Sequence, residues 1–253
     1  PVFSNTYQLD IARQPINLTG KSVQKITVNG TIPAPTLYFK EGEDVVINVT
    51  NHLDEDTSIH WHGLLLPAAM DGVPGANGFD GIKPNQTFTY HFKIRQAGTY
   101  WYHSHSNAQE QDGLYGAIVI TPKKSDPIKT DADYVVLLSD FSEETPKQII
   151  ANLKRDSSYY NNSRRTIGDF FADVKNLGFK NAWQNAQNWS EMRMSSTDLS
   201  DVSNYTFLMN GKSPSQNWTG LFKAGQKVKL RFINASAMTF YDVRIPNLKM
   251  LVV

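Results

Sequence analysis

The runs Ile59-His60-Trp61-His62-Gly63 and Tyr100-Trp101-Tyr102-His103-Ser104-His105-Ser106 each place two histidines two positions apart in an apolar, β-prone setting. On a strand, residues i and i+2 project from the same face, roughly 6.6–6.8 Å apart along the chain. Because this separation is wider than the roughly 3.5–4 Å between the ions of a two-metal site, two imidazoles of one strand can serve neighbouring ions. The pattern predicts a metal site built from His60, His62, His103 and His105.

The histidine pairs and the cysteine count together restrict the metal. Neutral imidazole suits copper, zinc, iron and nickel, and an all-histidine set without thiolate favours copper or zinc. A single His-x-His run is more often surface or core chemistry, but two runs, each braced by tryptophan, favour a site. The sequence has no cysteine, which excludes disulfides, a cysteine nucleophile and the thiolate copper site of blue-copper electron transfer.

Length, charge and hydropathy narrow down the kind of protein that this sequence can encode. The 253 residues suffice for one large or two ordinary domains, each with its own core. The chain has 25 basic and 24 acidic side chains, so its formal charge is only +1. This balance does not indicate binding to nucleic acid or to an anionic membrane. No apolar run approaches the roughly 18 residues of a transmembrane helix. The opening Pro1-Val2-Phe3-Ser4-Asn5 contains no signal peptide, which is compatible with a processed exported protein.

Residues 1–121 are predicted to form a series of short strands. Between Thr87 and Ile94, apolar and polar side chains alternate, which predicts a strand with one buried face. The inward positions would be Phe88, Tyr90, Phe92 and Ile94. His91 falls on the outward face and His52 in a loop, so we expect both at the surface. The spacing of the strands is typical of a β-sandwich or barrel, and the predicted class is mainly β.

A charged, proline-bounded stretch at residues 122–132 predicts a linker, and the apolar run from Asp133 begins a second domain over residues 133–253. Residues 145–194 depart from the β pattern. Thr145, Pro146 and Gln148 form a capping-box signature for one helix. Two further helices are expected from about Asp169, ending at Gly178, and from about Asn181. This stretch is therefore predicted as a helical insertion.

After the insertion the β pattern returns. Strands are expected over residues 205–209, 226–233 and 240–245, and the chain ends on an apolar strand at Met250–Val253. Because that last run has no stop signal, we expect the second domain to be incomplete.

The two histidine motifs resemble the first two copper motifs of the multicopper oxidases. The longer runs from His60 to Gly75 and from Gly98 to Ile120 resemble the bacterial copper-resistance protein A branch of that family. The resemblance covers essentially the whole chain. It implies two cupredoxin-like Greek-key β-sandwiches, residues 1–121 and a truncated, helix-bearing 133–253, together with copper as cofactor and export to the bacterial periplasm.

The resemblance also implies a role for each histidine in a trinuclear cluster that reduces O2 while Cu(I) or an organic donor is oxidised. His60 would ligate the type 2 copper, His62 and His103 one copper of the type 3 pair, and His105 the other. The family completes this cluster with a C-terminal cupredoxin domain, which also holds the type 1 copper. No histidine follows position 105. We therefore expect an N-terminal fragment, inactive alone, whose partners are copper, O2 and that domain.

Asp71 is the remaining candidate. Asp71-Gly72 is a common turn pair, and local sequence alone favours a turn residue. The resemblance shifts the interpretation, because some multicopper oxidases place an acidic residue at this spacing beside the type 2 copper. A carboxylate there can relay the protons that O2 reduction consumes. We expect Asp71 within hydrogen-bond reach of His60, directly or through one water.

Other functions remain open at this point. A periplasmic protein that sequesters copper without catalysis would use the same histidines. A zinc hydrolase is a third alternative, but no Asp or Glu lies within either motif. Met192 and Met194 could form a soft site for Cu(I), although packing is the favoured interpretation. Trp61 and Trp101 are interpreted as core braces of the copper strands. A downstream His-Cys-His motif in the gene would indicate the oxidase, and a stop codon after Val253 would favour sequestration.

Overall fold

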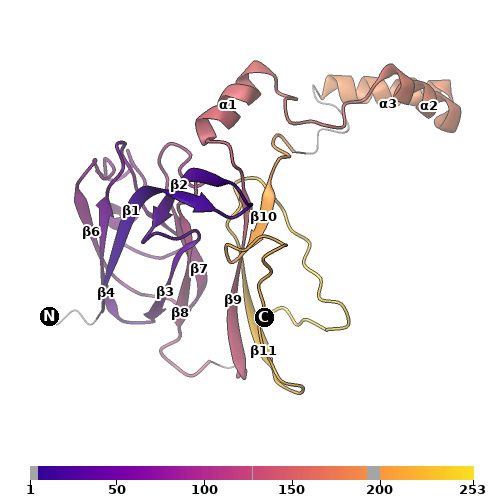
Figure 1. Cartoon of the computed structure of the whole chain (residues 1–253). Coiled ribbons are helices and arrows are strands. Elements are labelled where there is room, and N and C mark those ends of the chain that lie inside the picture. The colour runs from indigo at the N-terminus through magenta and orange to yellow at the C-terminus, as the bar shows by residue number, and fades with distance from the viewer. Residues whose placement is uncertain (1–4, 127, 193–199) are drawn as a thin grey trace. The chain divides into compact units, whose positions relative to one another are not determined.

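The computed structural model describes residues 5–126, 128–192 and 200–253 and confirms the mainly β class. Two compact units make up the chain. Unit 1 comprises Pro1–Glu143 and Thr206–Val253, and unit 2 comprises Glu144–Tyr205. Unit 1 holds three sheets and unit 2 holds three helices (Figure 1). Among the described helices, none is both long and apolar enough to cross a membrane.

The first sheet of unit 1 has the strand order β2-β1-β4-β6. Its strands are β1 (Asn5–Asn17), β2 (Ser22–Val28), β4 (Asp44–Asn51) and β6 (Thr87–Lys93). β1 runs antiparallel to β2 and parallel to β4. On β6, the alternation predicted from the sequence is confirmed, since Tyr90 and Phe92 are buried while Thr89, His91 and Lys93 are exposed.

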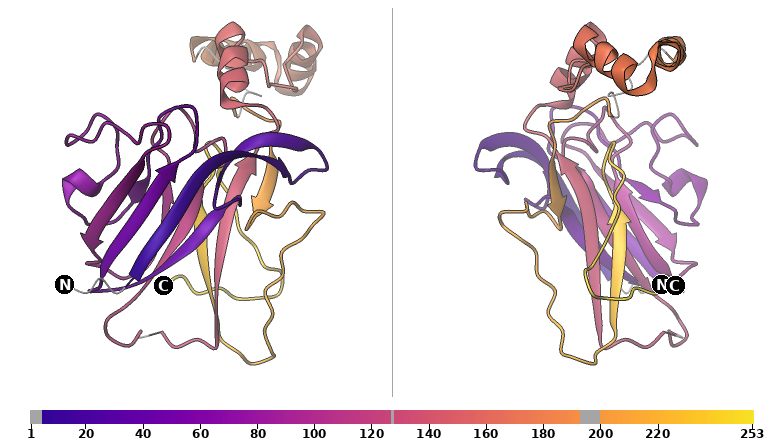
Figure 2. Two further views of the ribbon diagram at one scale, coloured as in Figure 1. Left: turned by 60° about the vertical axis from the view of Figure 1, so that its left-hand side comes forward. Right: turned by 90° about the vertical axis from the view of Figure 1, so that its right-hand side faces the viewer.

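The second sheet carries both histidine motifs and has the order β3-β8-β7-β5. Its strands are β3 (Ala34–Lys40), β5 (His60–His62), β7 (Gly98–His103) and β8 (Tyr115–Thr121). β3, with its proline at Pro35, lies at one edge, as expected of a residue without an N–H donor. β5 forms the opposite edge, and among the described strands it pairs only with β7. The strands of the first sheet, indigo to purple, lie side by side in the left-hand view of Figure 2.

The main core lies between these two sheets. Fully buried side chains from the first sheet, among them Ile47 and Tyr90, pack with Trp61 and Tyr102 of the second. Trp61 lies between His60 and His62, and Tyr102 directly precedes His103, so the burial of both fixes the direction of the histidine side chains. Because successive residues of a strand point to opposite faces, burying Trp61 and Tyr102 turns His60, His62 and His103 to the other face.

The third sheet has the order β10-β9-β11, with β9 (Ala132–Phe141), β10 (Thr206–Met209) and β11 (Val228–Asn234). β11 runs parallel to β9, and β10 antiparallel to it. The strands predicted over residues 240–245 and 250–253 are wrong, since both segments lack regular structure and Phe240 is 96% exposed. Apolar residues favour a strand, but a strand needs a neighbouring backbone to pair with, and neither segment pairs with any backbone that the structure describes.

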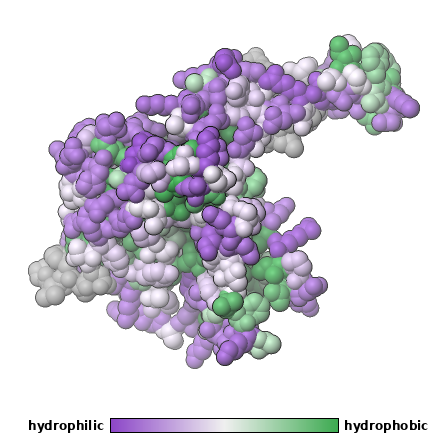
Figure 3. Space-filling model, in the orientation of Figure 1, coloured by the Kyte–Doolittle hydropathy of each residue, from purple (hydrophilic) through white to green (hydrophobic). Residues whose placement is uncertain are grey.

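Unit 2 confirms the helical insertion, with α1 (Pro146–Arg155), α2 (Ile167–Leu177) and α3 (Phe179–Glu191). The capping box predicted at Thr145 and Gln148 is present. α2 begins two residues earlier than expected, because Thr166 and Asp169 form a second capping box that the sequence reading missed. A small core of this unit includes Ile149, Tyr160 and Val202. Figure 3 shows exposed apolar side chains over α2 and α3, at the upper right.

Candidate metal centre

The antiparallel pairing of β5 with β7 builds the site. His60 lies opposite His103, and His62 lies opposite Trp101. Residues directly opposite in an antiparallel pair have side chains on the same face, with Cβ atoms about 4.5–5.5 Å apart. Two short motifs far apart in the sequence are thereby brought to one point of the sheet.

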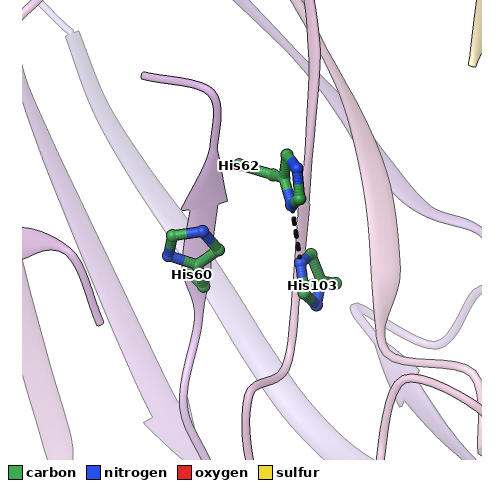
Figure 4. A group of neighbouring side chains, drawn as sticks. All are labelled: His60, His62 and His103. Carbon is green, nitrogen blue, oxygen red and sulfur yellow. Dashed lines mark hydrogen bonds between the residues drawn. The ribbon is translucent and has the colours of Figure 1, made fainter. Parts of the chain in front are cut away.

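Three imidazoles form a tight group. One ligand nitrogen from each of His60, His62 and His103 lies within 4.8 Å of the others. His62 Nδ1 and His103 Nε2 are 3.1 Å apart, and the two rings point toward one another (Figure 4). The His60 ring centroid is 5.6 Å from that of His62 and 5.5 Å from that of His103. Such convergence of ring nitrogens is what one metal ion, or a closely spaced group of ions, requires.

His105 lies beside this group without belonging to it. Its ring centroid is 5.6 Å from that of His60 and 5.9 Å from that of His103. It follows the end of β7, where its backbone N–H donates to Ser58 Oγ at 3.0 Å, and its side chain is exposed. The structure therefore gathers all four predicted histidines, with His105 on the solvent side.

The Nδ1 atoms of His60 and His103 both meet oxygen acceptors. His60 Nδ1 is 2.9 Å from the main-chain oxygen of Asp71 and 3.4 Å from its carboxylate Oδ1. His103 Nδ1 is 2.9 Å from both the main-chain oxygen of Ser104 and Oε2 of Glu110. An imidazole that donates from Nδ1 keeps the lone pair of Nε2 for a metal. In both rings the acceptors thus favour metal binding through Nε2.

Asp71 is therefore close to His60, as the family resemblance implied, but chiefly through its backbone. The residue ends a short 3-10 helix, Ala68–Met70, and its carboxylate is about one-third exposed. The carboxylate faces both His60 and solvent, which is the position a proton relay requires. Its catalytic role stays a prediction.

Glu110 is the residue of the site that sequence reasoning missed. It lies five positions after His105, and a turn through residues 107–113 brings it back to His103. The sequence showed only an acidic residue in the loop that follows the second histidine motif. Such a residue does not by itself predict a contact with His103. Asp71 meets His60 at Nδ1, and Glu110 meets His103 at Nδ1, the ring nitrogen opposite the one that faces His62. They therefore support the histidines rather than add carboxylate ligands beside them.

Trp101 packs against the rings of the group. Its indole stacks on His103, with centroids 4.3 Å apart and an interplanar angle of 20°, and on His62 at 5.0 Å and 29°. The pKa of His62 is lowered, first by burial and then by the neighbouring His103 and His60. A lowered pKa keeps the imidazole neutral at neutral pH, which is the form that binds metals.

The other predicted residues lie outside this group. His52 and His91 are exposed, as expected. Met192 is 60% exposed, so the expectation that it packs is wrong, because α3 buries only Ala182 among its own residues. Met194 lies outside the described residues. Trp61 is fully buried in the main core, in agreement with its interpretation as a brace.

The donor set fits copper. It consists of imidazole nitrogens from two strands, with their far nitrogens held by oxygen acceptors. Imidazole suits copper and zinc, and two of the four rings, those of His62 and His105, belong to exposed residues. By itself, this chemistry does not separate the two metals.

Comparison with known proteins distinguishes them. Two multicopper oxidase family models match residues 10–125 and 132–253. The chain is 51% identical over 98% of its length to a copper resistance protein A homolog of Pseudomonas syringae pv. tomato, of which it covers 42%. It is also 51% identical, again over 98% of its length, to copper resistance protein A of Escherichia coli, of which it covers 41%.

A solved structure agrees with these matches. Blue copper oxidase from Nitrosomonas europaea superposes with a TM-score of 0.65 at 28% identity, over 91% of this chain and 61% of that one. The chain spans less than half the length of the two copper resistance proteins it matches. Sequence, fold and donor set agree, and the chain belongs to the multicopper oxidase family, in the branch of the copper resistance protein A proteins.

Proposed function

We propose that this chain is the N-terminal part of a periplasmic multicopper oxidase involved in copper resistance. It would supply half of the histidine ligands of a trinuclear copper cluster that reduces O2 to water while Cu(I) or an organic donor is oxidised. The observation that carries the proposal is the convergence of His60, His62 and His103 within 4.8 Å. Copper, when bound, would supply the redox chemistry.

The roles of the four histidines follow the same proposal. His62 Nδ1 and His103 Nε2 lie 3.1 Å apart, which supports their binding to one type 3 copper. His60 would bind the type 2 copper through Nε2, because its Nδ1 is engaged by Asp71. His105, on the solvent side, would bind the second type 3 copper. Trp101 would hold the His62 and His103 rings by stacking and limit the access of water.

The division of the protein is also part of the proposal. Two cupredoxin-like domains, 1–121 and 133–253, would be joined by the linker at 122–132. The two family-model matches support it, because one ends at residue 125 and the next begins at 132. A C-terminal cupredoxin domain would complete the cluster and hold the type 1 copper, since this chain has no cysteine. Its relatives are more than twice its length, which is consistent with such a domain.

The test compares ligand and control histidines in the full-length protein. Changing His62 or His103 to Ala should lower bound copper and abolish O2 consumption with Cu(I) as donor. The matched controls are His52→Ala and His91→Ala, which remove exposed imidazoles and should change neither quantity. Copper content unaffected by His62→Ala and His103→Ala would contradict the proposal.

Two further measurements separate the alternatives. Wild-type protein that binds copper tightly but consumes O2 only at background would favour sequestration over oxidation. Cell fractionation tests the compartment, and a mature protein found in the cytosol would contradict the periplasmic assignment.

A further inference from the structure

Glu110 brings a carboxylate to the His103 ring at Nδ1, away from His62. Its Oε2 and the main-chain oxygen of Ser104 both lie 2.9 Å from Nδ1. An ionised carboxylate and a carbonyl oxygen only accept hydrogen bonds, so Nδ1 carries the proton of the neutral ring. Nε2 then keeps its lone pair and faces His62 Nδ1.

The loop that carries Glu110 is held by its preceding neighbour. Gln109 is buried, and its Oε1 accepts from Thr57 Oγ1 at 2.7 Å and from Ser104 Oγ at 2.9 Å. Its Nε2 donates to the main-chain oxygen of Asp56 at 2.8 Å. Both ends of the Gln109 amide are therefore bonded to the segment that leads into β5 or to the end of β7. This arrangement places Glu110 directly beside the histidine strands.

Asp112, two residues after Glu110, attaches the same loop to the rest of unit 1. Asp112 is buried and accepts from Arg13 Nη1 at 2.6 Å and from Lys25 Nζ at 3.1 Å. Arg13 lies on β1 and Lys25 on β2, so these two contacts tie the loop to the first sheet. With Gln109 and Asp112 anchored, the backbone of Glu110 is fixed from both sides. The fold thus sets where the Glu110 side chain begins, and the rotamer of that side chain brings the carboxylate to His103.

We propose that Glu110 is a positioning residue for His103. With its Oε2 2.9 Å from Nδ1, beside the Ser104 oxygen that accepts the Nδ1–H, it favours this tautomer, holds the plane of the ring and presents Nε2 to the metal. The inference rests on the proposed copper site, and it concerns a residue that has no role in that proposal. Partners that bond the far nitrogen of a metal-bound histidine typically change metal affinity by roughly 10–100-fold when they are removed.

The first experiment measures copper affinity in the full-length protein by titration against a competing chelator. Glu110→Ala should lower the affinity by roughly 10–100-fold. Glu110→Gln, which keeps an acceptor oxygen at nearly the same place, should recover most of the loss. The matched control is Asp54→Asn, which removes one negative charge from an exposed site on the loop before β5. A folded Glu110→Ala protein with wild-type copper affinity would overturn the proposal.

The second experiment uses metal-free protein and does not depend on copper binding. Nitrogen-15 labelling of histidine and long-range proton–nitrogen correlation spectra report which ring nitrogen carries the proton. Wild-type His103 should be protonated at Nδ1, and that proton should exchange with water faster in Glu110→Ala than in Asp54→Asn. A wild-type His103 protonated at Nε2 would refute the role of Glu110. If wild-type protein binds no copper, the proposed function is wrong. These spectra would still show whether Glu110 influences which nitrogen of His103 carries the proton.

Discussion

The two oxygens that Asp71 offers to His60 have separable roles. The main-chain oxygen lies 2.9 Å from Nδ1, where it orients the ring, and we expect the partly exposed carboxylate, at 3.4 Å, to carry protons. In the full-length enzyme, Asp71→Asn should therefore keep copper but slow reoxidation of the reduced cluster by O2, by about 10²-fold if proton transfer limits the step. Stopped-flow mixing with O2 measures this rate, with Asp54→Asn as control. An unchanged rate would make Asp71 an ordinary turn residue.

His62 predicts how the stability of the metal-free protein changes with pH. Burial and the neighbouring imidazoles of His103, His60 and His105 lower its pKa in the folded state below the unfolded value of about 6.5. Folding then favours the neutral ring, so this contribution to stability is present above the unfolded pKa and is lost as the pH falls through the folded one. Replacing His62 with Gln should make the fall in Tm between pH 7 and pH 5 shallower. Identical slopes for both proteins would contradict the expectation.

At the scale of elements, two glycines of the loop after β5 form a matched pair. Gly72 and Gly75 have φ values of +74° and +80°. A Cβ on Gly72 would lie 1.8 Å from the main-chain oxygen of Ile59, next to His60, whereas a Cβ on Gly75 meets nothing within 4 Å. Gly75→Ala should cost about 1–2 kcal/mol, from backbone strain alone. Gly72→Ala should cost a further ~1–3 kcal/mol and lower copper content, because Ile59 must move. Denaturant unfolding measures the loss of stability in each variant. Equal losses for Gly72→Ala and Gly75→Ala would show that the loop adjusts to the added Cβ, which would contradict the prediction.

The elements also show which features the sequence could predict. Helix α1 was predictable because its capping box lies within four residues, and β6 because its alternation is local. The His-x-His pairs indicated a metal site because each pair lies on one strand. The contact of Glu110 with His103 was not predictable, since it depends on how the turn after His105 folds back. The strand expected over residues 240–245 failed for a related reason, because pairing is a property of two segments.

At the scale of the whole molecule, the site lies at an edge of its sheet. β5 is the last strand of its order, and His105 is exposed beside it. The main core of unit 1 lies between two sheets and includes none of the four histidines. Trp61 and Tyr102, which belong to that core, fix the strands that carry them. The fold therefore presents a preformed set of imidazoles to whatever completes the metal site.

This arrangement predicts the behaviour of the chain produced by itself. It holds four histidines at the site and no cysteine, so it lacks the thiolate copper that accepts electrons from a donor. It should take up copper through His60, His62, His103 and His105, more weakly than the full-length protein. O2 consumption with Cu(I) or a phenolic donor should remain at background, and the intense visible absorption of a thiolate copper should be absent.

An oxygen electrode measures the O2 consumption and an absorption spectrum the thiolate copper, with circular dichroism as the control for folding. Turnover by the folded chain would mean that these four histidines suffice for catalysis, and the proposed division of the site between two parts of the protein would be wrong.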